Sequence, residues 1–387
     1  MIHRVASTTG RGIVGAFSSV SRSRHGKAVL LLVVVVLTAG CTGFFAGDES
    51  GGDGAAVDSV PEGVDSVMHF EGAFLTDSTT EELMNGIIEM GGTPASDMGV
   101  EEPESWQDAL DQMESESDLS VEDFESATVF GKSEQALENG EEYGGVIVKS
   151  DWEWEDFQQL AEEEGDISDV TEDSYNGVTV YIEENEFGQE TWVADLGDGM
   201  FALGPKTVVE DVIDTNQGDA DPFSGDLRDA FESTTDGYMM AAMTVSENQA
   251  AMASDIASDQ AEVDGRIFPD PKVMTMSYHT DGDRMNLEVQ MTMETQEAAN
   301  QVMVSLEQIA NRPGAGEDVD PATDPMSWFS NALSAEQSDE TVTMTFAAEP
   351  GDLLTAIETF AGGDMMPDGP MPPGFAMHGP QGISVTG

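Results

Sequence analysis

Apolar and polar residues alternate along several segments of the chain, most clearly between residues 274 and 293. Met274, Met276 and Tyr278 share one side of a predicted strand, and Asp281-Gly282-Asp283 is a turn signal. On the return, every second residue from Met285 to Met293 is apolar. Because side chains alternate between the two faces of a strand, this pattern predicts a β-hairpin with one face in the core.

Similar patterns predict further strands and helices. The other predicted strands span residues 64–70, 124–130, 143–148, 178–182, 190–195, 199–204, 238–245 and 342–346. Apolar residues spaced three and four apart predict helices at 79–88, 150–160, 205–213, 226–232, 246–261, 298–310 and 353–360. Residues 238–245 are apolar on both faces, so we expect a central strand there, whereas the acidic residues 91–120 are expected to be irregular.

This order of elements predicts an α+β fold. Strand pairs with tight turns, separated by single helices, favour antiparallel sheets with helices packed on one face. We expect two related subdomains at residues 62–245 and 263–362, with a connecting helix at 246–262. Residues 363–387 are rich in Met, Pro and Gly, which predicts a disordered tail.

The N-terminus has a different composition from the rest of the chain. Residues 1–40 contain basic residues but no acidic residue, and the ten residues Ala28 to Leu37 are all apolar. Basic, apolar and small residues in this order predict a secretory signal peptide. A ten-residue helix spans roughly 15 Å, about half the thickness of the hydrocarbon layer, so a permanent transmembrane helix is the weaker alternative.

Cys41, which follows this segment, is the only cysteine, so an internal disulfide is excluded. The run Leu37-Thr38-Ala39-Gly40-Cys41 resembles the lipobox of prokaryotic lipoproteins, in the form common among haloarchaeal surface lipoproteins of unknown function. Thr38 departs from the bacterial pattern, which usually has Leu there. The resemblance implies a lipid on Cys41 that anchors the chain to the outer face of the cytoplasmic membrane; the alternative is an incidental or buried thiol.

Two features flank the proposed anchor. Residues 41–61 are rich in Gly, Asp, Ser and Ala, which predicts a flexible spacer after Cys41. Upstream, the stretch from Arg22 to Lys27 has no adjacent arginine pair, so the general secretory and the twin-arginine export routes both remain open.

The charge of the chain indicates a saline environment. Asp and Glu number 77 against 13 Lys and Arg, giving a formal net charge of −64. Carboxylates at this density repel across much of a surface unless salt shortens the screening length to about 3 Å at 1 M. A hydrophobic content of 39% favours a folded domain over disorder, and the scattered cations argue against nucleic acid as a partner. The expected partners are the membrane, through the anchor, and hydrated counterions.

Motifs for catalysis or cofactors are absent from the sequence, and we expect no catalytic residue, cofactor or metal site. His69 and His279 lie in predicted strands, where a structural role is the ordinary one. The carboxylate clusters Asp219-Ala220-Asp221, Asp281-Gly282-Asp283 and Glu317-Asp318-Val319-Asp320 do not follow the calcium-loop pattern, so diffuse counterion association is expected.

Methionines and tryptophans suggest weaker alternatives to core packing. Thioethers on one face of the hairpin could bind copper or an apolar ligand, and Trp152 and Trp154 could stack on a sugar. Alternation places the methionines on an inward face, so we expect core packing. Tryptophans at such positions usually seal the edge of a core.

These observations favour a non-enzymatic surface protein that binds a small apolar or peptide ligand or serves envelope maintenance. The order of a strand at Phe201-Ala202-Leu203-Gly204, a helix led by Thr207, then Gly218 and another short helix resembles large secreted-protein families of unknown function. The resemblance covers about residues 124–245 and implies no activity. The alternatives are a carboxylate-dependent extracellular hydrolase and a purely structural surface protein. Two carboxylates facing each other in a polar cleft would favour the hydrolase.

The charge predicts that the folded part requires salt. Circular dichroism of the soluble domain should show loss of secondary structure below about 1 M salt, because carboxylate repulsion is then poorly screened. Retention of the folded spectrum in dilute buffer would contradict the proposed adaptation to brine.

Overall fold

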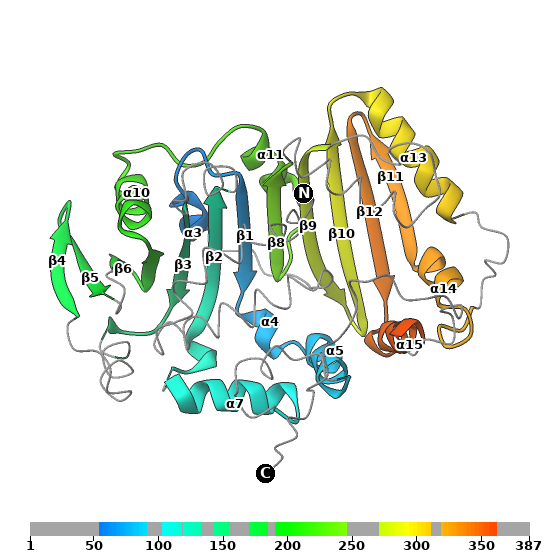
Figure 1. Cartoon of the computed structure of the whole chain (residues 1–387), viewed down its shortest axis with the longest axis horizontal. Helices are drawn as coiled ribbons and strands as arrows, with labels where there is room; N and C mark the ends of the chain where they lie inside the picture. Colours follow the sequence, from blue (N-terminus) through cyan, green and yellow to red (C-terminus); the bar gives the residue numbers. More distant parts are fainter. Residues whose placement is uncertain are drawn as a thin grey trace, which may run out of the picture.

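The computed structural model describes residues 54–90, 103–117, 119–132, 143–154, 156, 170–184, 190–245, 271–310 and 319–361. These residues form an α+β fold, as predicted, around one 12-stranded sheet (Figure 1). The predicted signal peptide at 1–40, the proposed lipobox with Cys41, the predicted connecting helix at 246–262 and the predicted tail at 363–387 lie outside the described residues. Among those described, no helix is both long and apolar enough to cross a bilayer.

All neighbouring strands pair antiparallel, in the order β11-β12-β10-β9-β8-β1-β2-β3-β7-β6-β5-β4. The strands are β1 (Ser66–Glu71), β2 (Phe124–Lys132), β3 (Tyr143–Ser150), β4 (Thr171–Tyr175), β5 (Val178–Glu184), β6 (Glu190–Gly197), β7 (Met200–Gly204), β8 (Met239–Thr244), β9 (Pro271–Asp281), β10 (Arg284–Met293), β11 (Leu333–Ser338) and β12 (Thr341–Ala348). The helices are α3 (Gly54–Asp58), α4 (Ala73–Thr76), α5 (Ser78–Glu89), α7 (Trp106–Ser117), α10 (Lys206–Gln217), α11 (Asp226–Ser233), α13 (Gln296–Ala310), α14 (Pro325–Ala332) and α15 (Pro350–Ala361).

Strand β8 connects the two halves of the sheet. It pairs with β1 on one side and with β9 on the other, so the prediction of a central strand at 238–245 is confirmed. The ranges expected to form two subdomains, 62–245 and 263–362, contribute β1–β8 and β9–β12 to the same sheet.

One face of the sheet, here called the α5 face, carries a continuous apolar row across the strands. The row consists of side chains aligned by strand pairing: Phe346, Leu287, Tyr278, Met239, Phe70, Ala127 and Val148. Helices α5, α7 and α15 pack against it through Leu83, Leu110 and Leu353, and all three lie near one end of the strands (Figure 1). Full burial of such a side chain contributes about 1.5–3 kcal/mol, so this row is a major part of the core.

The opposite face, here called the α10 face, has its own core. Val67 and Ile147 point to this side and pack with α3, α10 and α11. Helices therefore cover both faces of the sheet, a correction to the expectation of one covered face. The segment Val146-Ile147-Val148 explains this, because its side chains are apolar on both faces of the sheet. Helices must therefore pack on both faces to bury them.

Two expectations about irregular segments were wrong. Residues 54–61 are not part of a spacer, because α3 buries Ala56 and Val57 in the core and Val60 follows them there. Within 91–120, Trp106, Leu110 and Met113 form the buried stripe of helix α7. Their spacing of four and three residues is helical, but the surrounding acidic residues obscured it.

The predicted hairpin is confirmed as β9 and β10, which pair from Thr280 with Met285 to Met274 with Met291. Gly282 adopts a φ of +63° in the turn, a conformation that glycine tolerates best. The Thr79 hydroxyl donates to the Gly282 carbonyl oxygen at 3.0 Å, which attaches helix α5 to the hairpin.

Gly237, two residues before β8, marks a close approach between backbones. A Cβ atom there would overlap the main-chain oxygen of Tyr278 on β9. Gly237→Ala should therefore lower the free energy of unfolding by about 1–3 kcal/mol, measured by chemical denaturation in molar salt.

Gly351→Ala is the matched control for this substitution. Its Cβ would meet nothing closer than a Glu82 carboxylate oxygen at 3.8 Å, and it lies in the first turn of α15. This variant should be neutral or more stable by up to about 1 kcal/mol. Equal effects of the two substitutions would contradict the close approach.

Candidate functional site

A chain of three polar side chains lies at the centre of the sheet on the α10 face. His69 on β1 is aligned with Thr128 on β2, and Glu71 follows two residues later on the same face. The His69 Nδ1 atom lies 2.8 Å from the Thr128 hydroxyl oxygen, and Nε2 lies 3.0 Å from a Glu71 carboxylate oxygen. His69 is 1% exposed and Thr128 is fully buried at 0%.

The direction of these two hydrogen bonds depends on which ring nitrogen of His69 carries a proton. In the neutral tautomer with its proton on Nε2, His69 donates to an ionised Glu71, and its Nδ1 accepts from the Thr128 hydroxyl. The result is a hydroxyl, an imidazole and a carboxylate in the order that catalytic triads use. A nucleophile must reach its substrate, however, and the Thr128 oxygen is sealed within the sheet. In this conformation, the contacts hold β1 to β2, which fits the structural role expected for His69.

These three residues belong to a wider group of polar side chains on the α10 face. We call this group the polar band; its members are Thr128, His69, Glu71, Ser126, Ser277, Thr275, Glu288 and Gln290. Ser126 is aligned with Lys149 on β3, and the Lys149 ammonium lies 3.4 Å from a Glu125 carboxylate oxygen. The hydroxyls of Ser126, Thr275 and Ser277 are buried, and none of the described residues forms a hydrogen bond with them.

His279 lies on the same face but does not meet His69. Strand β8 separates β9 from β1, and the main-chain oxygen of His279 accepts a hydrogen bond from Asn286 at 3.2 Å. Within the described ranges, no three His, Cys, Asp or Glu side chains come together in a way that could hold a metal ion.

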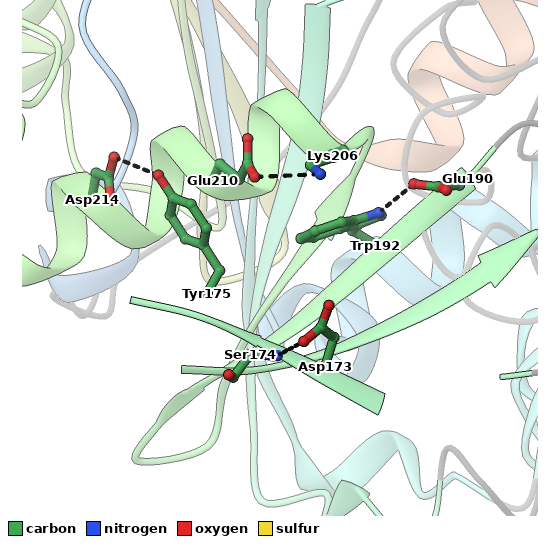
Figure 2. A network of polar contacts seen from close by, with 8 residues as sticks. All are labelled: Asp173, Ser174, Tyr175, Glu190, Trp192, Lys206, Glu210 and Asp214. Carbon is green, nitrogen blue, oxygen red and sulfur yellow. Dashed lines mark hydrogen bonds and ion pairs between the residues drawn. The ribbon is translucent and has the colours of Figure 1, made fainter. Parts of the chain in front are cut away.

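A second polar network ties helix α10 to the strands beneath it (Figure 2). The Tyr143 hydroxyl donates to Asp211 at 2.7 Å, and the Tyr175 hydroxyl donates to Asp214 at 3.1 Å. We call these four residues the α10 clasp. Its carboxylates are held by tyrosine hydroxyls, although basic residues are the usual partners of carboxylates on a protein surface.

Cations near the α10 clasp lie over aromatic rings. Lys206 lies 4.8 Å from the centre of the Trp192 ring and 3.8 Å from a Glu210 oxygen (Figure 2). Lys132 lies 3.8 Å from the centre of the Tyr143 ring. Such contacts contribute about 0.5–1 kcal/mol at exposed sites, so the few cations here serve packing as well as charge.

The hydrogen bonds to carboxylates change the acidity of both tyrosines. Burial and the adjacent Asp211 carboxylate raise the pKa of Tyr143 far above its ordinary value of 10.0. The hydrogen bond to Asp214 raises the pKa of Tyr175 in the same direction. An ionised tyrosine could not donate and would face a like charge, so both networks require the neutral hydroxyl.

The tryptophans and methionines considered as ligand-binding residues serve packing in this structure. The Trp152 indole donates to the Ser120 main-chain oxygen at 3.0 Å and packs beside Phe124, while Trp154 stacks on Tyr181. The hairpin methionines lie in or against the α5-face core, as their alternation predicted: Met274, Met276, Met285, Met291 and Met293.

The acidic clusters lie at exposed turns. Asp281 and Asp283 flank Gly282 in the hairpin turn, and Asp219 and Asp221 follow helix α10. Asp320 accepts from the Ala322 main-chain N–H at 2.9 Å, while Glu317 and Asp318 lie outside the described residues. The α10 clasp, in contrast, was missed from the sequence, because Tyr143 and Asp211 come together only through the fold.

The chain matches no family model and no curated protein sequence. Among solved structures it is similar to crystal form III of TP0453, with a TM-score of 0.43 and 10% identity over 80% of this chain and 100% of that one. Crystal form I of TP0453 gives a TM-score of 0.39 and 10% identity over 79% and 96% of the two chains. Scores at this level do not establish a shared fold.

Tyr143→Phe tests the α10 clasp, because phenylalanine keeps the ring beneath Lys132 and removes only the hydroxyl. Near neutral pH the variant should lose about 1 kcal/mol of unfolding free energy through the missing hydrogen bond. The folded-state pKa lies above the unfolded value of 10.0, so the wild-type contribution is present below pH 10.0 and is lost as the pH rises beyond it.

The free energy of unfolding, measured across this pH range, should therefore fall less steeply for Tyr143→Phe than for the wild type. Tyr175→Phe is the comparison, since burial is the main cause of the raised pKa of Tyr143 but not of Tyr175, and removal of the Tyr175 hydroxyl should have a smaller effect. Parallel pH profiles for wild type and Tyr143→Phe would show that the hydroxyl does not stabilise the folded state.

Proposed function

We propose that this chain is a lipid-anchored surface protein on the outer face of the cytoplasmic membrane of a halophilic archaeon, and that its folded part binds a partner without catalysis. The proposed location rests on Cys41, the single cysteine, which follows an apolar run and the small residues Ala39 and Gly40. The net charge of −64 supports an environment rich in salt.

A role in binding is supported by the burial of the most enzyme-like group. Thr128, His69 and Glu71 have the order of a catalytic triad, but the hydroxyl that would attack a substrate is fully buried. The hydrogen bonds among these three side chains instead stabilise the pairing of β1 with β2. A hydrolase that used Thr128 as its nucleophile would need this oxygen at a surface where a substrate can reach it.

The α10 face of β10 and β12 favours a peptide or another polar ligand over a small apolar one. Its side chains include Asn286 and Gln290 on β10 and Thr343 and Thr345 on β12, all partly exposed. Amides and hydroxyls both donate and accept hydrogen bonds, which suits a polar chain lying across the strands. We propose this surface as the part of the protein that meets its partner in the envelope.

The proposed anchor would keep the domain close to the membrane. Helix α3 begins at Gly54 and packs into the α10-face core, so Cys41 lies only thirteen positions before the folded part. A fully extended chain of that length reaches about 45 Å at most. The folded part would therefore act within this distance of the lipid surface.

Cys41→Ser tests the anchor in the native host. The wild-type chain should be found in the membrane fraction with a lipid mass on its first residue, whereas the variant should carry no lipid and be released, because one or two buried acyl or isoprenoid chains supply the membrane affinity.

Thr38→Leu is the matched control. It replaces the residue that departs from the bacterial pattern and should leave both lipidation and membrane retention unchanged. An unmodified Cys41 in the wild type, or full membrane retention of Cys41→Ser with its leader intact, would refute the anchor.

A further inference from the structure

Two hydroxyls on β9 are buried without a hydrogen bond from any described residue. Ser277 is 0% exposed and Thr275 is 4% exposed, and both side chains point to the α10 face, as Val273 does. Buried hydroxyls normally have a partner, because removing them from water without one is unfavourable. Both hydroxyls can therefore bind a further group on this face of the sheet.

The side chains next to these hydroxyls also carry oxygen atoms that could bind a cation. Strand pairing places Glu288 opposite Ser277 and Gln290 opposite Thr275. Directly opposed residues have Cβ atoms about 4.5–5.5 Å apart, so the four side chains form one cluster. A Glu288 oxygen accepts from the Thr235 hydroxyl at 2.9 Å and from the Gln290 amide at 2.7 Å. These contacts fix the position of the Glu288 carboxylate, and strand pairing places its residue directly opposite Ser277.

The charge of Glu288 lacks a basic partner in the part of the chain that the structure describes. The ion pairs found there do not include it, and its neighbours across the strands are Ser277 on β9 and Thr345 on β12. On the far side of Ser277, β8 contributes Met240, which supplies no charge. A partly buried carboxylate is normally balanced by a cation.

We propose that Thr275, Ser277, Glu288 and Gln290 form a binding site for one alkali cation, sodium or potassium. Hard cations bind oxygen ligands, and this cluster offers hydroxyl, amide and carboxylate oxygens. A single carboxylate matches a single positive charge, whereas a divalent ion would leave excess charge at a partly buried site. The site is separate from the proposed lipid anchor and does not depend on it.

The third unpartnered hydroxyl of the polar band provides a contrast. Ser126 is buried on the same face but is aligned with Lys149, whose ammonium group would repel a cation. Ser126→Ala is therefore a matched control for Ser277→Ala. Both substitutions remove one buried hydroxyl from the same sheet face, but only the second removes a proposed ligand.

Thermal unfolding of the complete folded part in molar NaCl, KCl and tetramethylammonium chloride, at equal ionic strength, tests the site. The wild type should have a higher Tm in the preferred alkali salt than in the tetramethylammonium salt, and the comparison of NaCl with KCl identifies the ion. Ser277→Ala and Glu288→Gln should retain about half or less of this difference. Ser126→Ala should retain all of it.

Equal differences in all four proteins would overturn the proposal, because they would reflect diffuse counterions alone. A crystal grown in rubidium chloride provides a second measurement, using rubidium as an anomalous scatterer in place of potassium. A peak between Ser277 and Glu288 supports the site, as does sodium-specific stabilisation without such a peak. The absence of both, with only ordered water between these residues, refutes it.

Discussion

The pairing of β8 with β1 and β9 is the interaction on which the rest of the structure depends. β8 is the junction between strands that lie before and after it in the chain, and both of its faces are buried: Met239 packs in the α5-face core and Ala242 in the α10-face core. Without this strand each half would expose an unpaired edge near its core. The sheet ends instead at β4 and β11, two short strands of five and six residues.

Burial of both faces decides which polar groups can lie at the centre of the sheet. Side chains such as His69 and Thr128, on the central strands β1 and β2, have almost no access to water, so their polar atoms need partners within the protein. His69 meets this condition on both ring nitrogens, through Thr128 and Glu71. The buried hydroxyls of Thr275 and Ser277, on the same face of the sheet, form no hydrogen bond with any described residue. His69 is therefore interpreted as structural, whereas the two hydroxyls are proposed as ligands of an ion.

The parts of the fold that could be predicted from sequence are those in which a local pattern agrees with the tertiary environment. The hairpin at 274–293 has strict alternation and a glycine turn, and β8 is apolar throughout, so both were predicted correctly. β4 was missed because Thr171 to Tyr175 is almost wholly exposed and is ordered by pairing with β5.

The polar contacts could not be predicted from the sequence for a different reason. His69 and Thr128 are 59 residues apart, and Tyr143 and Asp211 are 68 apart, so their contacts depend on strand register and helix placement.

The high negative charge then has two physically distinct consequences. Exposed carboxylates such as Asp211 and Asp214 take hydrogen bonds from tyrosines, which fix their positions but leave their charge unchanged. That charge must be screened by the ion atmosphere, and screening depends on ionic strength rather than on the identity of the cation. Glu288 differs because it lies partly buried between β9 and β12, in contact with Thr235 and Gln290, where the proposed ion would balance its charge directly. If the proposed site holds an ion, salt would act on this fold in two ways, one governed by concentration and the other by the size of a single ion.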